Sequence, residues 1–233
     1  MRNMDSHQND VRVAKRLSAT LRALLLVAAC TAVYGHIGSP HLHVTVNYIS
    51  DYAAAAYHWP WISFTMALFG VIYLLISFSI IHFSLHSAIS EVGGIAFSMA
   101  GLCMFFVAHY PTSRNNQGIK IWDADDQRQQ GWDKAYDLAH FDMITTSLVF
   151  LLTGICLSSI AGLRISTRSK HAKLSLIMAA LMAVLFVVGH EAPQHGLFQR
   201  LGFALNWVWL WIMTTGIAQW KYEGYSPSAS PGS

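Results

Sequence analysis

The sequence predicts an all-α integral membrane protein, a bundle of six transmembrane helices over residues 21–220 with both termini in the cytoplasm. Of the 233 residues, 54% are hydrophobic and only 12% are charged, whereas a soluble domain carries about 25% charged residues. The mean hydropathy is +0.38. Apolar runs of about 20 residues, long enough to cross a bilayer, recur along the chain. Both observations favour one compact membrane domain over a soluble protein.

The first apolar run, residues 21–36, follows a polar and basic segment, residues 1–20, which we expect to be a cytoplasmic tail. The letters VAAC at residues 27–30 resemble a bacterial lipobox, which would make Cys30 a lipidated N-terminus. The apolar stretch before Cys30 is short, and a chain with five further spans needs no such anchor. An ordinary first span is therefore the favoured interpretation.

The second and third spans carry the clearest helical signals. Residues 59–81 contain no charged side chain, and Pro60 falls in the first turn, where a missing N–H is tolerated. In the third span, residues 89–110, small residues recur four positions apart, which predicts close packing against another helix. The pairs with this spacing are Gly94 with Ser98 and Ala96 with Ala100.

The second half of the chain contains three more apolar runs after a polar segment, residues 111–138. We expect the fourth, fifth and sixth spans at residues 141–163, 174–189 and 201–220. The Ser/Pro-rich end of the chain, residues 221–233, has the composition of a disordered tail.

The distribution of basic residues sets the predicted orientation. With the N-terminus inside, the inner segments hold ten Lys and Arg residues and the outer segments hold five. Cytoplasmic loops carry the excess of Lys and Arg, so both termini are expected inside. The net charge of +3 does not indicate nucleic-acid binding, because the bases flank the spans rather than sharing one soluble face.

This orientation collects eight of the twelve histidines at the outer side. They are His36, His41, His43, His58, His109, His140, His190 and His195. His109 closes the third span, His140 opens the fourth and His190 closes the fifth, so three helices bring imidazoles to one depth. Asp51, Asp142 and Glu191 fall nearby in the outer segments. Ionisable groups at membrane depth are costly and usually have partners, so these side chains predict a polar pocket that opens outward.

The residues leave the chemistry of this pocket open. Asp133, Asp137 and His140 follow each other at i, i+4 and i+7, which puts them on one face if the fourth helix extends outward past the membrane. Three histidines with a carboxylate and one open position could form a catalytic zinc site, with His109, His140 and His190 as ligands. The same histidines could instead line a metal-free headgroup pocket, or only satisfy backbone and water hydrogen bonds.

Four short motifs resemble the domain-of-unknown-function 998 family of bacterial and archaeal six-span proteins. They are NYISDYA at 47–53, HYPTSRNN at 109–116, DLAHFDMITTSLVF at 137–150 and GLFQRLGF at 196–203. Their order and spacing match over about residues 20–220. The matching positions are Ser50, Asp51, Pro111, Thr112, His140 and Arg200. The chain departs from the family pattern at Ser113 and Arg114, where an acid often follows the PT pair, and it lacks the Gly that commonly precedes the fourth-span His.

The resemblance implies the architecture and a candidate site but no reaction, because the family has no established biochemical role. The ISD letters also resemble eukaryotic damage-regulated autophagy modulator and GPI-lipid-remodelling proteins, which implies lipid handling. We therefore expect a protein of the bacterial inner membrane that binds membrane lipids or amphiphiles by their headgroups. The expected pocket residues are Ser50, Asp51, His109, Thr112, Arg114, His140, Asp142, His190, Glu191 and Arg200.

Three alternatives remain open for this pocket. The first is a metal-dependent intramembrane hydrolase that acts on a lipid, with zinc bound by histidines and Asp51 or Glu191 as general base. The second is a haem-bearing electron carrier, with His109 and His140 as axial ligands. The third is a small transporter.

Overall fold

The computed structural model describes residues 4–38, 42–45, 48–49, 59–83, 87–110, 127–163, 165 and 168–220. All regular secondary structure within these residues is helical, so the all-α class is confirmed. The helices are α1 (Met4–Ile37), α3 (Trp59–Phe83), α4 (Ala88–His109), α5 (Gln127–Leu163), α6 (Ser169–Glu191) and α7 (His195–Trp220).

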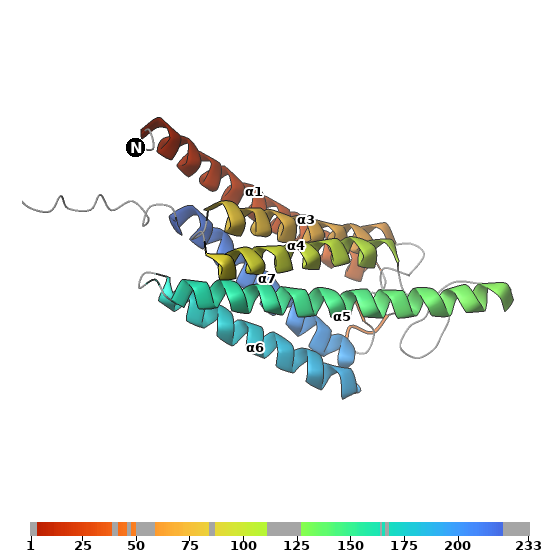
Figure 1. Ribbon diagram of the computed structural model, residues 1–233. Coiled ribbons are helices and arrows are strands. Elements are labelled where there is room, and N and C mark those ends of the chain that lie inside the picture. Colours follow the sequence, from red (N-terminus) through yellow and green to blue (C-terminus); the bar gives the residue numbers. More distant parts are fainter. Residues whose placement is uncertain are drawn as a thin grey trace, which may run out of the picture.

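The helices form a closed ring in which each one packs against the next in the chain, and α1 and α7 close the ring. Consecutive helices run in opposite directions (Figure 1). The starts of α1, α4 and α6 therefore share one end of the bundle with the end of α7, and we call this the N-terminal end. The opposite end, where α1, α4 and α6 finish and α7 begins, is called the distal end.

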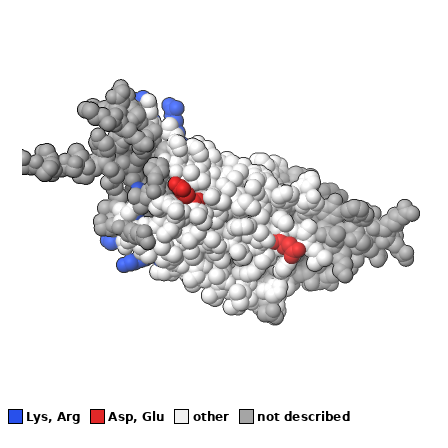
Figure 2. Space-filling model, in the orientation of Figure 1, with Lys and Arg blue, Asp and Glu red and all other residues white. Residues whose placement is uncertain are grey.

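Five helices in the described part of the chain are long and apolar enough to cross a membrane. Their apolar segments are Val11–Ile37, Trp61–His82, Ala88–His109, Leu138–Leu163 and Ser169–His190. Large apolar side chains such as Val33, Phe64 and Val187 are exposed on them, as expected for surfaces in contact with lipid. Figure 2 shows a mostly white surface that is interrupted by two small red acidic patches, with blue Lys and Arg atoms at one end of the visible face. The chain is thus an integral multi-pass membrane protein.

The sixth predicted span lies within helix α7, which is not one of the five apolar segments found among the described residues. Two helix boundaries differ from the expectation. Helix α1 begins at Met4, within the expected cytoplasmic tail. Helix α5 begins at Gln127 and has 37 residues, which is roughly 55 Å of helix against roughly 30 Å of bilayer hydrocarbon. The extension of α5 past the other helices is visible in Figure 1, and it is the condition under which the sequence places Asp133, Asp137 and His140 on one face.

Helices α3 and α4 approach closely through small residues, as the four-residue spacing predicted. The Ser77 hydroxyl donates to the Gly94 carbonyl over 2.6 Å and lies 2.7 Å from the Ser98 hydroxyl. Further along the same pair, a Cβ atom on Gly101 would lie 2.8 Å from the Gly70 carbonyl oxygen. The two backbones can come this close only because both positions lack a side chain.

Polar side chains join α1 to α7, the two helices farthest apart in the sequence. Ser18 donates to the Thr214 carbonyl over 2.6 Å, and the Trp207 indole donates to the Leu25 carbonyl over 3.1 Å. Arg22 lies 3.4 Å from the Thr214 hydroxyl and 5.7 Å from the ring centre of Trp211. These bonds fix the register between α1 and α7 and so position the side chains at the distal end.

Helices α3 and α7 also touch across the inside of the ring. The Asn206 amide donates to the Tyr73 hydroxyl over 2.7 Å, and Phe69 packs edge-on against Phe203 with 5.8 Å between ring centres. The Asn206 side-chain oxygen is buried and accepts no hydrogen bond from the described residues. The interior of the ring is therefore filled at this level by side chains from opposite helices.

Candidate functional site

The histidines gather at the distal end, as the sequence predicted. Six of the eight expected there lie in the described residues, at the ends of α1, α4 and α6, at the start of α7, in the segment 42–45 and in α5. They are His36, His43, His109, His140, His190 and His195. His82 and His171 lie at the opposite end, on the last turn of α3 and the first turn of α6. His41 and His58 fall outside the described residues.

His140 is the most deeply buried of these histidines, with 4% of its surface exposed. Its Nδ1–H donates to the carbonyl of Tyr110, the residue that follows the last turn of α4. Since a carbonyl can only accept, this bond fixes the proton on Nδ1. His140 therefore ties the middle of α5 to the end of α4.

His109 and His190 do not join His140 in a ligand set. Both imidazoles are exposed; His109 packs edge-on against Tyr110, and His190 lies 5.9 Å from the ring centre of Phe141. Asp142 is also exposed. Among the described side chains, no three His, Cys, Asp or Glu residues are grouped so that they could hold a metal ion.

Arg200 is the charged residue that the structure builds most firmly into the distal end. The side chain is half-buried on the second turn of α7; its Nε donates to His36 Nε2 over 3.2 Å and its Nη1 to the Gly196 carbonyl over 2.8 Å. His36 Nδ1 in turn donates to the Ala32 carbonyl over 2.7 Å. An imidazole that donates from Nδ1 and accepts at Nε2 is neutral, so the positive charge of this pair resides on Arg200.

The segment before the ISD motif is anchored to the same turns of α7. The Thr45 carbonyl accepts from the Leu197 amide over 3.0 Å, and Tyr48 stacks on His195 with 4.6 Å between ring centres. The Ile49 amide donates to the Gln199 side-chain oxygen over 2.6 Å. Ile49 is itself buried, so the chain enters the ISD motif beside the second turn of α7.

Five of the predicted pocket positions remain untested by these contacts. Ser50, Asp51, Thr112 and Arg114 lie outside the described residues, and so does the side chain of Glu191. The side chains of Asp133 and Asp137 also lie outside the described residues. Of the three residues predicted to share one face of α5, only the side chain of His140 is described.

The sequence placed His36 at this end of the bundle but not among the expected pocket residues, and it did not single out Gln199. The available signals were the position of His36 at the end of the first apolar run and the position of Gln199 beside Arg200 in the GLFQR motif. Together, the described residues form a rigid guanidinium beside a neutral imidazole at the first turns of a helix. This arrangement suits the pairing of a phosphate or carboxylate oxygen.

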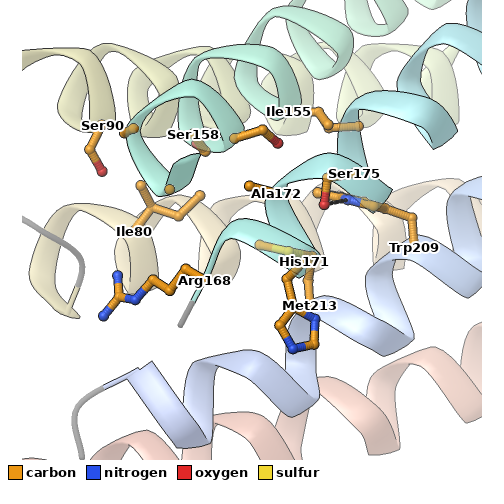
Figure 3. Close-up of a pocket in the computed structure, with 13 residues that line it drawn as sticks. Ile80, Ser90, Ile155, Ser158, Arg168, His171, Ala172, Ser175, Trp209 and Met213 are labelled. Carbon is orange, nitrogen blue, oxygen red and sulfur yellow. Dashed lines mark hydrogen bonds between the residues drawn. The ribbon is translucent and has the colours of Figure 1, made fainter. Parts of the chain in front are cut away.

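A second feature, which the sequence did not indicate, is a cavity of about 50 Å³ at the N-terminal end (Figure 3). It is lined by residues of α3 to α7, with Arg168 at its α6 side. In the sequence, the basic turn that contains Arg168 indicated only the orientation of the chain in the membrane.

The comparisons with known proteins identify one relationship. The family model described as "Protein of unknown function (DUF998)" matches residues 22–216. This interval includes all four motifs on which the resemblance rests. No curated protein matches the chain, and no solved structure matches it.

Proposed function

Because the chain belongs to the domain-of-unknown-function 998 family, for which no activity is established, we propose a function from the geometry of its distal end. The protein binds the headgroup of a lipid or amphiphile there, with Arg200 pairing an anionic group. The observation that carries this proposal is the guanidinium of Arg200, held between His36 and the Gly196 carbonyl where α7 begins.

The proposal includes an orientation in the membrane. The bases on the described helices favour the N-terminal end, which holds Arg12, Lys15, Arg16, Arg22, Arg168, Lys170 and Lys173, whereas the distal end holds Arg200 and, on the extension of α5, Arg128 and Lys134. By the positive-inside rule this distribution supports cytoplasmic termini and an outward-facing distal end. Helix α7, with 26 residues, is roughly 39 Å long and can serve as the sixth span. We assign the protein to the bacterial inner membrane.

The level of Arg200 in the bundle suits a headgroup. Arg200 lies one turn inside the start of α7, and the neighbouring histidines mark the ends of α1, α4 and α6. Arginine presents a planar fork of donors that matches the oxygens of a phosphate, and it is more weakly hydrated than lysine. Hydrogen bonds to charged groups contribute about 1.5–3 kcal/mol each, so one such pair is enough to select anionic over neutral headgroups.

Lipid retention tests the proposal. The full-length protein is purified in mild detergent, and the lipids that remain bound are quantified by mass spectrometry for the wild type, Arg200→Gln, Asp51→Ala and Arg12→Gln. Arg12→Gln is the matched control, because it removes one exposed positive charge at the opposite end of the bundle. We expect Arg200→Gln to lose anionic lipid and Arg12→Gln to keep it. An unchanged lipid profile in both Arg200→Gln and Asp51→Ala would refute headgroup binding at this end.

The same preparations distinguish the other functional classes. Stoichiometric zinc after gentle purification would favour the metal-dependent hydrolase, with ligands that include residues outside the described part of the chain. A Soret band in the visible spectrum would favour a haem-bearing carrier.

A further inference from the structure

The cavity at the N-terminal end lies where five helices meet. Its walls come from the end of α3, the start of α4, the last turns of α5, the first turns of α6 and the second half of α7. A volume of about 50 Å³ accommodates several water-sized groups. Figure 3 shows the labelled side chains arranged around this space, with Arg168 extending along it toward the side of Ile80 and Ser90.

The polar part of the lining consists of one cation, one imidazole and several hydroxyls. Besides Arg168 these residues are Ser90, Ser158, Ser159, Ser175 and His171. The Arg168 Nε is shielded from solvent. The Ser158 hydroxyl is buried and makes no hydrogen bond to any residue that the structure describes. A buried hydroxyl with this environment is normally satisfied by a water or a ligand.

Helix α6 adds a favourable field for an anion at the same place. Arg168 is its N-cap residue, and no side chain caps the amides of the first turn. The N-terminus of a helix carries a partial positive charge and amide donors that bind phosphate and similar anions. Lys170 and Lys173, on the first turns of α6, are exposed to solvent and do not line the cavity.

The remaining lining is apolar. Ile80, Ile155, Trp209 and Met213 face the polar groups across the cavity, and the Trp209 indole N–H is already used by Ser175 over 3.0 Å. A ligand that fits both sides carries an anionic group beside carbon. Phospholipids have this character, and basic pockets between transmembrane helices near the cytoplasmic side bind lipid phosphates.

We propose that this cavity binds a phosphate group. Arg168, the first-turn amides of α6 and the Ser158 hydroxyl hold the phosphate oxygens, and the apolar wall takes the adjoining carbons of a phospholipid from the leaflet at this end. The site lies at the opposite end of the bundle from Arg200, so it does not depend on the function proposed there.

Two variants, each of which removes one positive charge, test the site. Arg168→Gln removes a cation that lines the cavity, whereas Lys170→Gln removes an exposed cation two residues away that does not line it. Full-length protein is incubated with phosphatidylglycerol or phosphatidylcholine in detergent, and bound lipids are counted by native mass spectrometry. Arg168→Gln should weaken phosphatidylglycerol binding by about tenfold, the loss of one charge-assisted hydrogen bond. Lys170→Gln should change it by less than about twofold, because an exposed charge is screened.

Ser158→Ala distinguishes a loss of lipid binding from a loss of folding stability. It removes a hydroxyl that has no hydrogen-bond partner among the described residues, so the melting temperature of the lipid-free protein should stay unchanged or rise. Phosphatidylglycerol binding should still fall. A variant that is equally or more stable but binds less lipid cannot be explained by a damaged fold.

A second arm separates a lipid phosphate from a free one. The melting temperature is measured with inorganic phosphate and with sodium chloride at equal ionic strength. Stabilisation by phosphate in the wild type but not in Arg168→Gln, without a preference for phosphatidylglycerol, would assign the site to soluble phosphate and support the same chemistry. Equal losses in Arg168→Gln and Lys170→Gln, or no response to either phosphate source, would overturn the proposal.

Discussion

The close approach of α3 and α4 at Gly101 gives a prediction whose size follows from the structure. An alanine at Gly101 would place its Cβ 2.8 Å from the Gly70 carbonyl oxygen and 3.1 Å from Leu74 Cγ. The first contact is with backbone, which cannot rotate away, so the helices must separate. Such overpacking costs about 1–3 kcal/mol. The helix propensity gained on replacing Gly by Ala returns up to about 1 kcal/mol.

Gly202 in α7 supplies the matched control, because a Cβ there would meet no atom within 4 Å. Gly202→Ala gains the same helix propensity without the clash, so the difference between the two variants isolates the contact. Unfolding in mixed detergent micelles, followed by circular dichroism, should show Gly101→Ala less stable than Gly202→Ala by about 1–3 kcal/mol. Equal stabilities would show that α3 and α4 do not approach each other this closely at Gly101.

Three further predictions concern buried polar groups and topology. Tyr73→Phe leaves the Asn206 amide without its acceptor and should destabilise the protein by about 1–3 kcal/mol. The double variant Tyr73→Phe/Asn206→Leu should recover stability in the same unfolding assay. Failure of the double variant to recover stability would argue against this hydrogen bond. Ser77→Ala removes the hydrogen bonds to α4 and should cost about 0.6–2 kcal/mol, and an unchanged unfolding midpoint would contradict it. A fluorescent-protein fusion after Ser233 should fluoresce and an alkaline phosphatase fusion there should be inactive; active phosphatase would reverse the orientation.

Sequence patterns predicted the architecture because burial in a membrane leaves simple signals. Uncharged runs located the helices, and the small residues Gly94 and Ser98 identified the face of α4 that meets α3. The boundaries were less predictable. Helix α1 continues back to Met4 through polar residues, since a helix does not have to end where the bilayer does. Helix α7 covers the sixth predicted span but begins before it, at His195.

The candidate site was predicted only in part, because the sequence places residues by depth and not by direction. Depth correctly brought His109, His140 and His190 to the distal end. Direction separates them: His140 is buried against Tyr110, and the other two imidazoles are exposed. The partnership of His36 with Arg200 joins residues 164 positions apart. It depends on the closure of the ring by α1 and α7, which no local pattern contains.

The cavity at the N-terminal end illustrates the same limit of sequence patterns. Ser90, Ser158 and Ser175 are isolated small residues within apolar runs, and they share a wall only because α4, α5 and α6 converge there. Basic residues near Arg168 already had a sufficient explanation in the positive-inside rule. A single basic residue can both orient the chain in the membrane and bind a ligand, so its role in orientation gave no reason to expect a binding site.

Photo-crosslinking in a bilayer can locate a lipid headgroup bound where α7 begins. Full-length protein in nanodiscs is irradiated with a phospholipid that carries a photoactivatable headgroup, and the adducts are mapped by peptide mass spectrometry. We expect adducts on residues 195–203 that are reduced in Arg200→Gln, alongside any adducts at the Arg168 cavity. No adducts on residues 195–203, or adducts there that are unchanged in Arg200→Gln, would contradict headgroup binding at the start of α7.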